Sequence, residues 1–311
     1  MRKLMLFLLL LVVVNTLFAE IQTGSTSGID TSGEFILQGS TLPEIKLGFT
    51  RRFIFPFLQG VSPLTEGNNI NLALTADISP ISLNGYADAV WTPIAFFQIA
   101  AGGRIGSGWN LKLGDNDVYG IGINFSDSEG KAKVSGNAFD GLLWKTYIGA
   151  ALQADLAAVF PGDWNHIVFR SYHETNYKGY TQAASGESWY YENDDGENIN
   201  GFNYYGNFLI GYQMPIFINL AAFLAEMDLY LYDTPNRNQW GDEKIRWTFS
   251  NIISFTVTGQ IGISLVTQFR TRINYSEPNW DELYYRNRTV DKSNPLRLEF
   301  YRVAAAITYK F

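Results

Sequence analysis

The chain has 311 residues, of which 46% are hydrophobic, 15% aromatic and 17% charged, and its net charge is −7. The apolar and aromatic fractions exclude a disordered protein, and the lack of cysteine excludes disulfide scaffolds and cysteine-ligated metal sites. The excess of acidic residues argues against a nucleic-acid partner. The charged fraction lies below the roughly 25% of an average soluble domain. This low value indicates that part of the surface is solvated by something other than water.

The N-terminus has the pattern of a secretory signal peptide. Two basic residues at 2–3 precede an apolar run over 4–14, and a polar-to-small segment ends at Ala19. The apolar run is too short to span a bilayer as a helix, which disfavours a membrane anchor. We expect cleavage after Ala19, then a flexible Ser/Thr/Gly-rich periplasmic lead-in over 20–32, then a folded domain over 33–311.

The interior of the chain repeats one pattern, in which an apolar residue stands at every second position of segments separated by turn-rich stretches. Such alternation places apolar side chains on one face of a β-strand and polar side chains on the other. A helix would instead spread the charges over its whole circumference. The predicted strands are 33–40, 44–57, 69–78, 81–91, 95–106, 141–158, 166–178, 202–214, 217–232, 244–258, 260–274 and 296–311.

The stretch 214–232 is the strongest competitor for a helix, because it is long and apolar. A membrane helix here would bury Glu226 and Asp228, at a cost of about 2.5–3.5 kcal/mol for each carboxylate. A strand places both carboxylates on its polar face. We therefore predict a strand.

The last strand alternates up to the final residue, where Phe311, Tyr309 and Ile307 share one face. This pattern resembles the closing strand of bacterial outer-membrane β-barrel proteins, which typically end in Phe with apolar residues at alternate positions before it. The resemblance implies an all-β, transmembrane, antiparallel up-and-down barrel in the outer membrane of a diderm bacterium. It also implies contact with outer-membrane lipid and recognition of these three residues by the barrel-assembly machinery. It names no single family and no oligomeric state.

The pattern gives about 12 strands, although 10 or 14 remain possible because 117–135 could hold a further hairpin. Long connections at 107–140, 179–201, 233–243 and 275–295 alternate with short turns. In outer-membrane barrels the short turns face the periplasm, which would place the C-terminus at the periplasmic rim.

Aromatic residues near the predicted strand ends suit the membrane–water interface, where one end of the ring is apolar and the other can form hydrogen bonds. Trp91 and Phe255 lie beside short turns, and Trp247 and Tyr301 lie near the outer strand ends. A secreted sandwich with aromatic core residues is the alternative. It does not explain why so many strands end in aromatic residues.

Strand parity predicts which charged residues face the lumen. Four arginines on the last three strands should form one basic face beside two acids, and a second set of mixed sign lies on 141–158 and 166–178. The predicted lumen residues are Arg246, Arg270, Arg272, Arg302, Glu226, Asp228, Arg170 and Glu174, with Lys145, Asp155, Tyr172 and Asn176 beside the last two.

Two functions follow from such a lumen, and both stay open at this point. Opposite charges across a narrow polar channel would favour a passive channel for small polar solutes, with anions preferred. A salt-bridge network would instead fill the lumen, leaving a structural or surface-interaction barrel whose extracellular loops carry the function. Small residues at Ala100, Gly102 and Gly106 leave room for a plug, a loop or a solute.

The acidic loop 186–201 does not match the spacing of a calcium-binding loop, and we interpret it as a solvated loop. We expect no metal site and no cofactor. A lipid-modifying barrel enzyme is a second alternative. His173 is predicted near the outer end of a strand, with Ser171 and Thr175 on the same face. The spacing assembles no Ser-His-Asp arrangement, so we expect no enzymatic activity.

Overall fold

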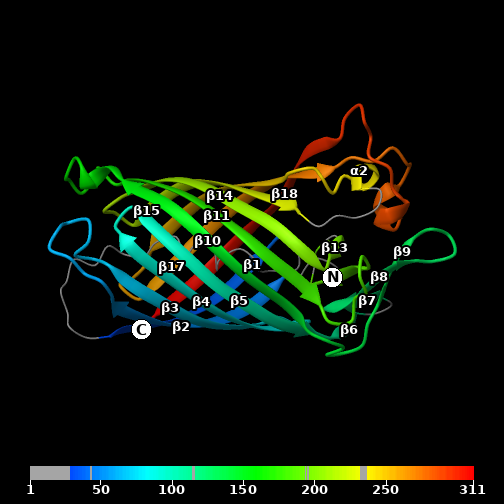
Figure 1. Ribbon diagram of the computed structural model, residues 1–311, viewed down its shortest axis with the longest axis horizontal. Helices are drawn as coiled ribbons and strands as arrows, with labels where there is room; N and C mark the ends of the chain where they lie inside the picture. The colour runs from blue at the N-terminus through cyan, green and yellow to red at the C-terminus, as the bar shows by residue number, and fades with distance from the viewer. Residues whose placement is uncertain (1–28, 43, 114–115, 193, 195, 232–236) are drawn as a thin grey trace.

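Twelve antiparallel strands close into a barrel in the computed structural model, which describes residues 29–42, 44–113, 116–192, 194, 196–231 and 237–311 (Figure 1). The strands are β1 (Asp30–Ser40), β2 (Ile45–Pro56), β3 (Asn69–Ile78), β4 (Ser82–Ile94), β5 (Phe97–Gly108), β10 (Leu143–Asp155), β11 (Ile167–Tyr180), β14 (Gly201–Gln213), β15 (Ile218–Tyr230), β16 (Arg246–Thr256), β17 (Ile261–Ile273) and β18 (Leu296–Lys310). Each strand pairs with the next along the chain, and β18 pairs with β1. The predicted up-and-down barrel is confirmed.

The extra hairpin suspected in 117–135 exists, but it lies outside the barrel wall. It is formed by β8 (Ile121–Ser126) and β9 (Ala132–Ser135), which belong to a separate four-stranded sheet. The barrel therefore has 12 strands and not 14. At the other end, β1 begins at Asp30, three residues before the predicted boundary. The predicted signal peptide and residues 20–28 of the lead-in lie outside the described residues.

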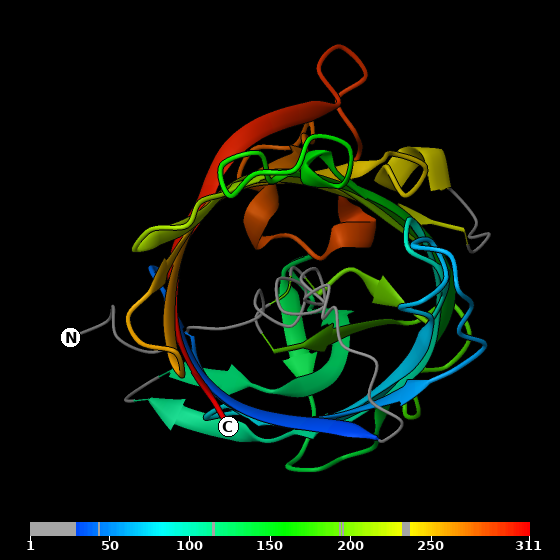
Figure 2. The ribbon, with the colours of Figure 1, turned by 90° about the vertical axis from the view of Figure 1, so that its left-hand side faces the viewer.

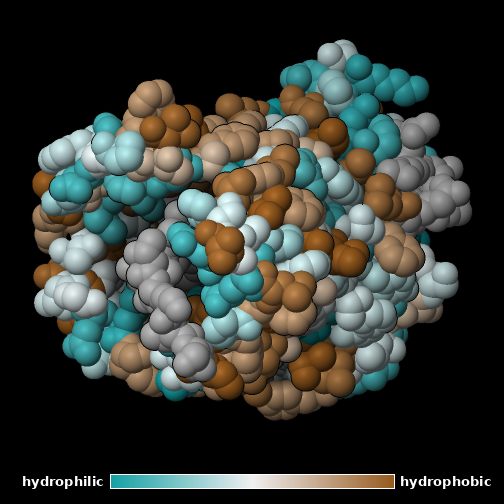
Figure 3. Space-filling view, turned by 60° about the vertical axis from the view of Figure 1, so that its left-hand side comes forward, coloured by the Kyte–Doolittle hydropathy of each residue, from teal (hydrophilic) through white to brown (hydrophobic). Residues whose placement is uncertain are grey.

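The wall carries apolar side chains on its outside and polar ones inside. On β17, Leu265 and Phe269 are exposed, whereas Gln268 is completely buried in the lumen. Figure 3 shows apolar side chains spread over the wall, with hydrophilic ones gathered on the loop at the upper right. A secreted sandwich would bury its apolar faces against each other, so that alternative is excluded. None of the described helices is long and apolar enough to cross a membrane.

The C-terminal residue closes the seam between β1 and β18. The backbone of Phe311 exchanges two hydrogen bonds with Gly33, of 2.8 and 2.9 Å. Its ring stacks on Phe35, Phe49 and Tyr309, with ring centroids 5.6, 6.4 and 6.1 Å apart. A Cβ atom at position 33 would lie 2.6 Å from this ring, so a larger residue there would push the ring aside. An aromatic cluster thus surrounds the short-turn end of the seam.

One aromatic prediction is wrong. Tyr301 was expected at the outer membrane interface, but the pairing of β17 with β18 contains a bulge between Gln268 and Phe269. The extra residue in β18 breaks the alternation. The Tyr301 ring therefore lies beside two lumen-facing guanidinium groups, with the Arg270 and Arg302 carbons 4.3 and 4.8 Å from its centroid.

The long connections fold together at one end of the barrel. The separate sheet runs in the order β13 (Asn198–Ile199), β12 (Ser188–Tyr191), β8, β9, and a two-stranded sheet joins β6 (Asn110–Leu113) to β7 (Asn116–Tyr119). The connection between β15 and β16 holds α2 (Arg237–Trp240), and the last connection holds the short helical turns η2 (Trp280–Glu282) and η3 (Tyr285–Asn287).

We call the described residues of 121–135, 188–199 and 280–290 the lid. Its three parts are bonded to one another: the Ser188 hydroxyl donates to the Asn124 carbonyl at 3.2 Å and lies 2.9 Å from the Tyr284 hydroxyl, and the Tyr284 amide donates to the Gly130 carbonyl at 3.0 Å. Viewed along the barrel, the strands form a ring and parts of the lid lie within its outline (Figure 2). The lid therefore covers part of the outer mouth.

Candidate functional site

Glu174 on β11 is the centre of a hydrogen-bonded group on the lumen wall. Its Oε1 atom accepts hydrogen bonds from Lys145 Nζ at 2.6 Å and from Asn176 Nδ2 at 3.0 Å, and its Oε2 atom accepts one from the Tyr172 hydroxyl at 2.7 Å. All four residues were predicted to face the lumen. The structure brings them together because β10 and β11 are neighbours and parity turns these side chains to one face.

Two further tyrosine–carboxylate pairs line the same wall. The Tyr147 hydroxyl donates to Asp88 at 2.6 Å, and the Tyr205 hydroxyl donates to Glu226 at 2.7 Å. Tyr147 reaches Asp88 across Gly102, where an added Cβ would lie 2.8 Å from the Tyr147 ring and 2.5 Å from the carboxylate. The room predicted at Gly102 is thus used by a tyrosine of the wall.

The predicted basic face exists, but its arginines are paired. Arg302 donates to Glu44 at 2.6 Å and to Gln268 at 2.7 Å, and Arg270 donates to Glu299 at 3.0 Å. Acidic partners on the turn between β1 and β2 and on β18 itself supply these bonds. These bonds partly neutralise the arginines and connect neighbouring strands of the wall.

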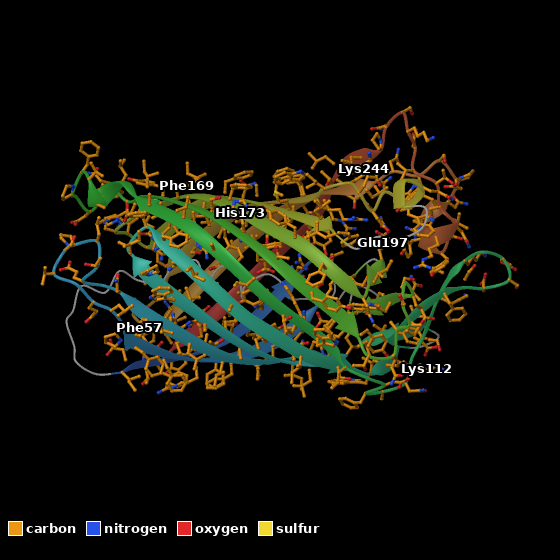
Figure 4. The ribbon with its side chains drawn as sticks, in the orientation of Figure 1. Phe57, Lys112, Phe169, His173, Glu197 and Lys244 are labelled. Carbon is orange, nitrogen blue, oxygen red and sulfur yellow. The ribbon has the colours of Figure 1, made fainter. Side chains whose placement is uncertain are left out.

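Arg246 and Asp228 pair in register on β16 and β15. The Arg246 guanidinium also lies 3.3 Å from Glu197, which belongs to the lid. Figure 4 places Glu197 at the loop end of the barrel, opposite the end that holds Phe57. Arg246 thus connects the wall to the lid.

A dense group of arginines surrounds Trp280 at the outer mouth. The guanidinium carbons of Arg272, Arg288 and Arg297 lie 4.7, 5.2 and 5.0 Å from its ring centroid. Guanidinium groups bind aromatic faces through the negative potential of the ring. The predicted lumen residue Arg272 is therefore packed against the last outer connection.

One attachment of the lid to the wall is Glu192, which sequence reasoning missed. Its Oε1 atom accepts a hydrogen bond from the Ser82 hydroxyl at 2.6 Å and from Asn84 at 3.2 Å, and it lies 3.1 Å from Lys46 Nζ and 3.8 Å from Arg104. Burial alone would raise the pKa of Glu192, but Lys46 and Arg104 together with Ser82 hold it below its usual value. The expectation of a solvated acidic loop is wrong for this residue, which is 6% exposed.

The backbone at Glu192 is strained, with a φ of 52°. A left-handed conformation in a residue other than glycine persists only where the surroundings fix it. The neighbouring Tyr191 hydroxyl donates to Asn84, and a Cβ at Gly106 would lie 2.9 Å from that hydroxyl. The room predicted at Gly106 is therefore filled by the lid.

Asp194 organises its own loop. Its Oδ1 atom accepts hydrogen bonds from the backbone amides of Gly196 at 2.9 Å and Tyr191 at 3.3 Å, and its other oxygen accepts one from Asn198. Burial raises the pKa of Asp194 to about 7, although these hydrogen bonds oppose the shift. Across the part of the chain that the structure describes, no group of three or more His, Asp or Glu residues could hold a metal ion.

His173 lies on the outer, lipid-facing side of β11, between Ser171 and Tyr204. Its Nε2 atom is 2.9 Å from the Ser171 hydroxyl, and its Nδ1 atom is 2.5 Å from the Tyr204 hydroxyl. The prediction of a position near the outer strand end is wrong, because His173 is halfway along a strand of 14 residues (Figure 4). Its second nitrogen meets a phenol and not a carboxylate.

Comparisons with known proteins identify no family for this chain. A scan against protein-family models gives no match, and neither does a comparison with curated proteins. The chain is similar to the solved structure of the KdgM porin in complex with disordered oligogalacturonate, at 10% identity and a TM-score of 0.36, covering 90% of this chain and 99% of that one. It is similar to OmpT of Vibrio cholerae at 7% identity and a TM-score of 0.35, with coverage of 93% and 99%.

A third similar structure is Salmonella typhi OmpF in complex with daunomycin, at 7% identity and a TM-score of 0.31, with coverage of 91% and 97%. Likeness at this level says nothing about the solute. The closed wall with its apolar outside has the architecture of the bacterial outer-membrane β-barrels.

Proposed function

We propose that this protein is a narrow passive channel of the outer membrane for small polar solutes. One observation carries the proposal: several ionisable groups of the lumen are bonded along the wall, to partners on the same or nearby strands. Lys145 and Glu174 join adjacent strands, and Arg302 and Gln268 do the same on the other side. Side chains that are bonded along the wall do not need to cross the lumen, and this favours a water-filled centre.

The location follows from the same architecture. An apolar outer surface with aromatic residues near the short-turn end suits contact with outer-membrane lipid after export and cleavage of the signal peptide. Phe311, Tyr309 and Ile307 remain our proposed contact for the barrel-assembly machinery. Supporting this role, Phe311 and Tyr309 belong to the aromatic cluster at the seam.

The lid gives the channel its narrow outer mouth, and the arginines around Trp280 give it a preference for anions. Rings of basic side chains favour anions in other pores through the same electrostatic attraction. Arg272 belongs to this group, and Arg270 lies two residues before it on β17, on the same face of the strand.

The test is conductance in planar lipid bilayers. The purified protein should show discrete conductance steps, and replacing Arg270 and Arg272 with Glu should shift the ion preference toward cations. The matched control replaces Lys131 and Lys133 with Glu, the same charge change on the exposed β8–β9 hairpin, and should leave selectivity as it was. Unchanged selectivity in the Arg270/Arg272 variant would remove these residues from the pore.

The bonding within the lid favours one other candidate function, a surface-interaction barrel with a closed lumen. Arg288 on the last connection lies 3.3 Å from Glu197 on the loop between β11 and β14, so distant loops hold each other in place. Such a lid could present a binding surface. A wild-type protein that never conducts, beside a lid-shortened variant that does, would favour this candidate over the channel.

The lipid-modifying alternative draws support only from the Ser171–His173 distance. Polar groups facing hydrocarbon must satisfy each other's hydrogen bonds, because no water is available there. Ser171, His173 and Tyr204 do this for one another. We propose a structural role for this group and no enzymatic function.

A further inference from the structure

Asp228 on β15 is a lumen carboxylate that is open to solvent. Strand parity turns its side chain inward, where Leu224 and Tyr230 on the same face are buried, yet Asp228 itself is exposed. The wall surrounds this residue, so its exposed surface adjoins a space inside the barrel that can hold at least a water molecule. Asp228 therefore marks accessible room in the lumen.

The Asp228 carboxylate forms no hydrogen bond and no ion pair with the part of the chain that the structure describes. It differs in this from Glu226, two residues away on the same face, whose Oε1 atom accepts a hydrogen bond from the Tyr205 hydroxyl at 2.7 Å. An ionised carboxylate can accept several hydrogen bonds. Those of Asp228 are available to a molecule in the adjoining space.

Lys145 on β10 supplies an accessible group of opposite charge. Its ammonium lies 2.6 Å from Glu174 and 5.5 Å from the centroid of the Tyr147 ring, and its side chain is 33% exposed. An ammonium has three N–H donors, and Glu174 is the one acceptor that binds them among the described residues. Lys145 can therefore donate to a second acceptor on its exposed side.

The two groups belong to one section of the wall. The strands β10, β11, β14 and β15 are consecutive, and Glu174, Tyr205 and Asp228 stand in one row across the last three. Neighbouring strands are about 4.8 Å apart, so the row from Glu174 to Asp228 spans roughly 10 Å of wall. Lys145 reaches this row through its bond to Glu174 and acts electrostatically on Asp228 without bonding to it.

We propose that the space beside Asp228 and Lys145 binds small zwitterions, which are solutes that carry an ammonium and a carboxylate a few carbon atoms apart. The solute ammonium donates to Asp228, and the solute carboxylate accepts from Lys145. Glu226 adds negative potential on the Asp228 side. This inference rests on the proposed function, because solutes must enter the lumen, and it names their class.

An ion of a single sign can use only half of this site. An anion would bond to Lys145 but would be repelled by the two acids of β15, Glu226 and Asp228. A cation would bond to Asp228 but would be repelled by Lys145 and by Lys178, which also acts on Asp228 from β11. A zwitterion gains a charge-assisted hydrogen bond at each end.

The test is a saturation-transfer NMR titration of the purified full-length protein in deuterated detergent at neutral pH, with empty micelles as the blank. The probes are β-alanine, propionate and propylammonium, which share a three-carbon skeleton. β-Alanine carries both charges, and each of the others carries one. We expect β-alanine to bind at least about tenfold more tightly than either, because each charged end adds a charge-assisted bond.

Asp228→Asn removes the charge while keeping the shape, and it removes no hydrogen bond of the fold. It should weaken β-alanine binding about tenfold, because the ammonium loses its charged acceptor. Propionate binding should not weaken, because the variant also removes a repulsion. A misfolded variant would lose both ligands, so the pair of probes distinguishes a lost site from a lost fold.

Two further variants complete the series. Asp228→Glu keeps the carboxylate and should retain most of the β-alanine binding. Asp163→Asn makes the same charge change on the exposed turn between β10 and β11, and it should bind β-alanine like the wild type. Equal affinity of the wild type for β-alanine and propionate, or unchanged β-alanine binding in Asp228→Asn, would overturn the proposal.

Conductance of the same preparations separates this inference from the proposed function. β-Alanine binding that depends on Asp228 in a protein that never conducts would retain the site and remove the channel. Conductance without any β-alanine binding would retain the channel and remove the site.

Discussion

The two halves of the lumen handle their charges in different ways. In the outer half, arginines are bonded to acids of the wall and the lid, as Arg270 is to Glu299 and Arg246 to Glu197. In the half near the short turns, Arg170 lies beside Leu209, and its buried Nε atom has no hydrogen-bond acceptor among the described residues. Paired charges hold the wall and lid in one arrangement. A buried charge without a partner has no such bond to hold it and carries its desolvation cost uncompensated.

The largest expected effect comes from removing the part of the lid that lies between β11 and β14. Replacing residues 186–197 by a short Gly-Ser linker removes the attachment at Glu192 and the bond from Glu197 to Arg288. We expect the single-channel conductance to rise several-fold, because the outer mouth is no longer covered. The control replaces only the exposed residues 161–163 in the turn between β10 and β11, at the opposite end of the barrel. An unchanged conductance would show that the lid does not set the width of the path.

A smaller effect is expected from the Glu192 attachment alone. Glu192→Lys places one more cation beside Lys46 and Arg104. Breaking a buried ion pair costs about 3–5 kcal/mol. The lid should then be released, with a conductance between those of the wild type and the lid-shortened variant. The double variant Glu192→Lys, Lys46→Glu should recover part of the loss. A double-mutant cycle measures this coupling, and a coupling energy of zero would contradict the attachment.

The wall could be predicted from the sequence because its information is local. Alternation at a period of two decides both strand and face, and every strand boundary in the structure lies within three residues of the predicted one. The lumen face of Glu226, Asp228 and Glu174 follows from the same count. Tyr301 escaped this rule because a bulge in β18 cannot be seen in the pattern of one strand.

The partners of the lumen charges could not be predicted, because they depend on contacts between distant segments. Glu192 and Ser82 are 110 residues apart, and the sequence around either residue does not indicate that the two are in contact. Sequence reasoning therefore found the arginines but not the acids that neutralise them. It also placed Arg170 and Glu174 in one set of mixed sign. In the structure Glu174 is bonded to Lys145 and Tyr172, whereas Arg170 has no carboxylate partner among the described residues.

A third prediction concerns pH and acts on the lid alone. The pKa of Asp194 is raised to about 7 by burial, so its contribution favours the folded loop at low pH and is lost as the pH rises from about 4 through about 7. The pKa of Glu192 is lowered, so its contribution is present above its usual pKa and is lost only in stronger acid. The lid should therefore hold best in mildly acidic solution.

Conductance measured at about pH 5.5 and about pH 8 checks this sign. The wild type should conduct more at the higher pH, because the Asp194 carboxylate becomes charged in a buried position. Asp194→Asn should abolish the difference. A larger conductance at the lower pH would show that other groups control the lid.

The smallest effect is expected on the outer surface, where polar groups are paired as in the outer lumen but face lipid. His173→Ala leaves the Ser171 and Tyr204 hydroxyls without their shared partner, yet hydrogen bonds in membrane proteins contribute only about 1 kcal/mol each. We expect a slightly lower free energy of unfolding in urea, with conductance unchanged. If the wild type hydrolysed phospholipid in vesicles and His173→Ala did not, these groups would be a reaction centre and not a means of satisfying one another in hydrocarbon.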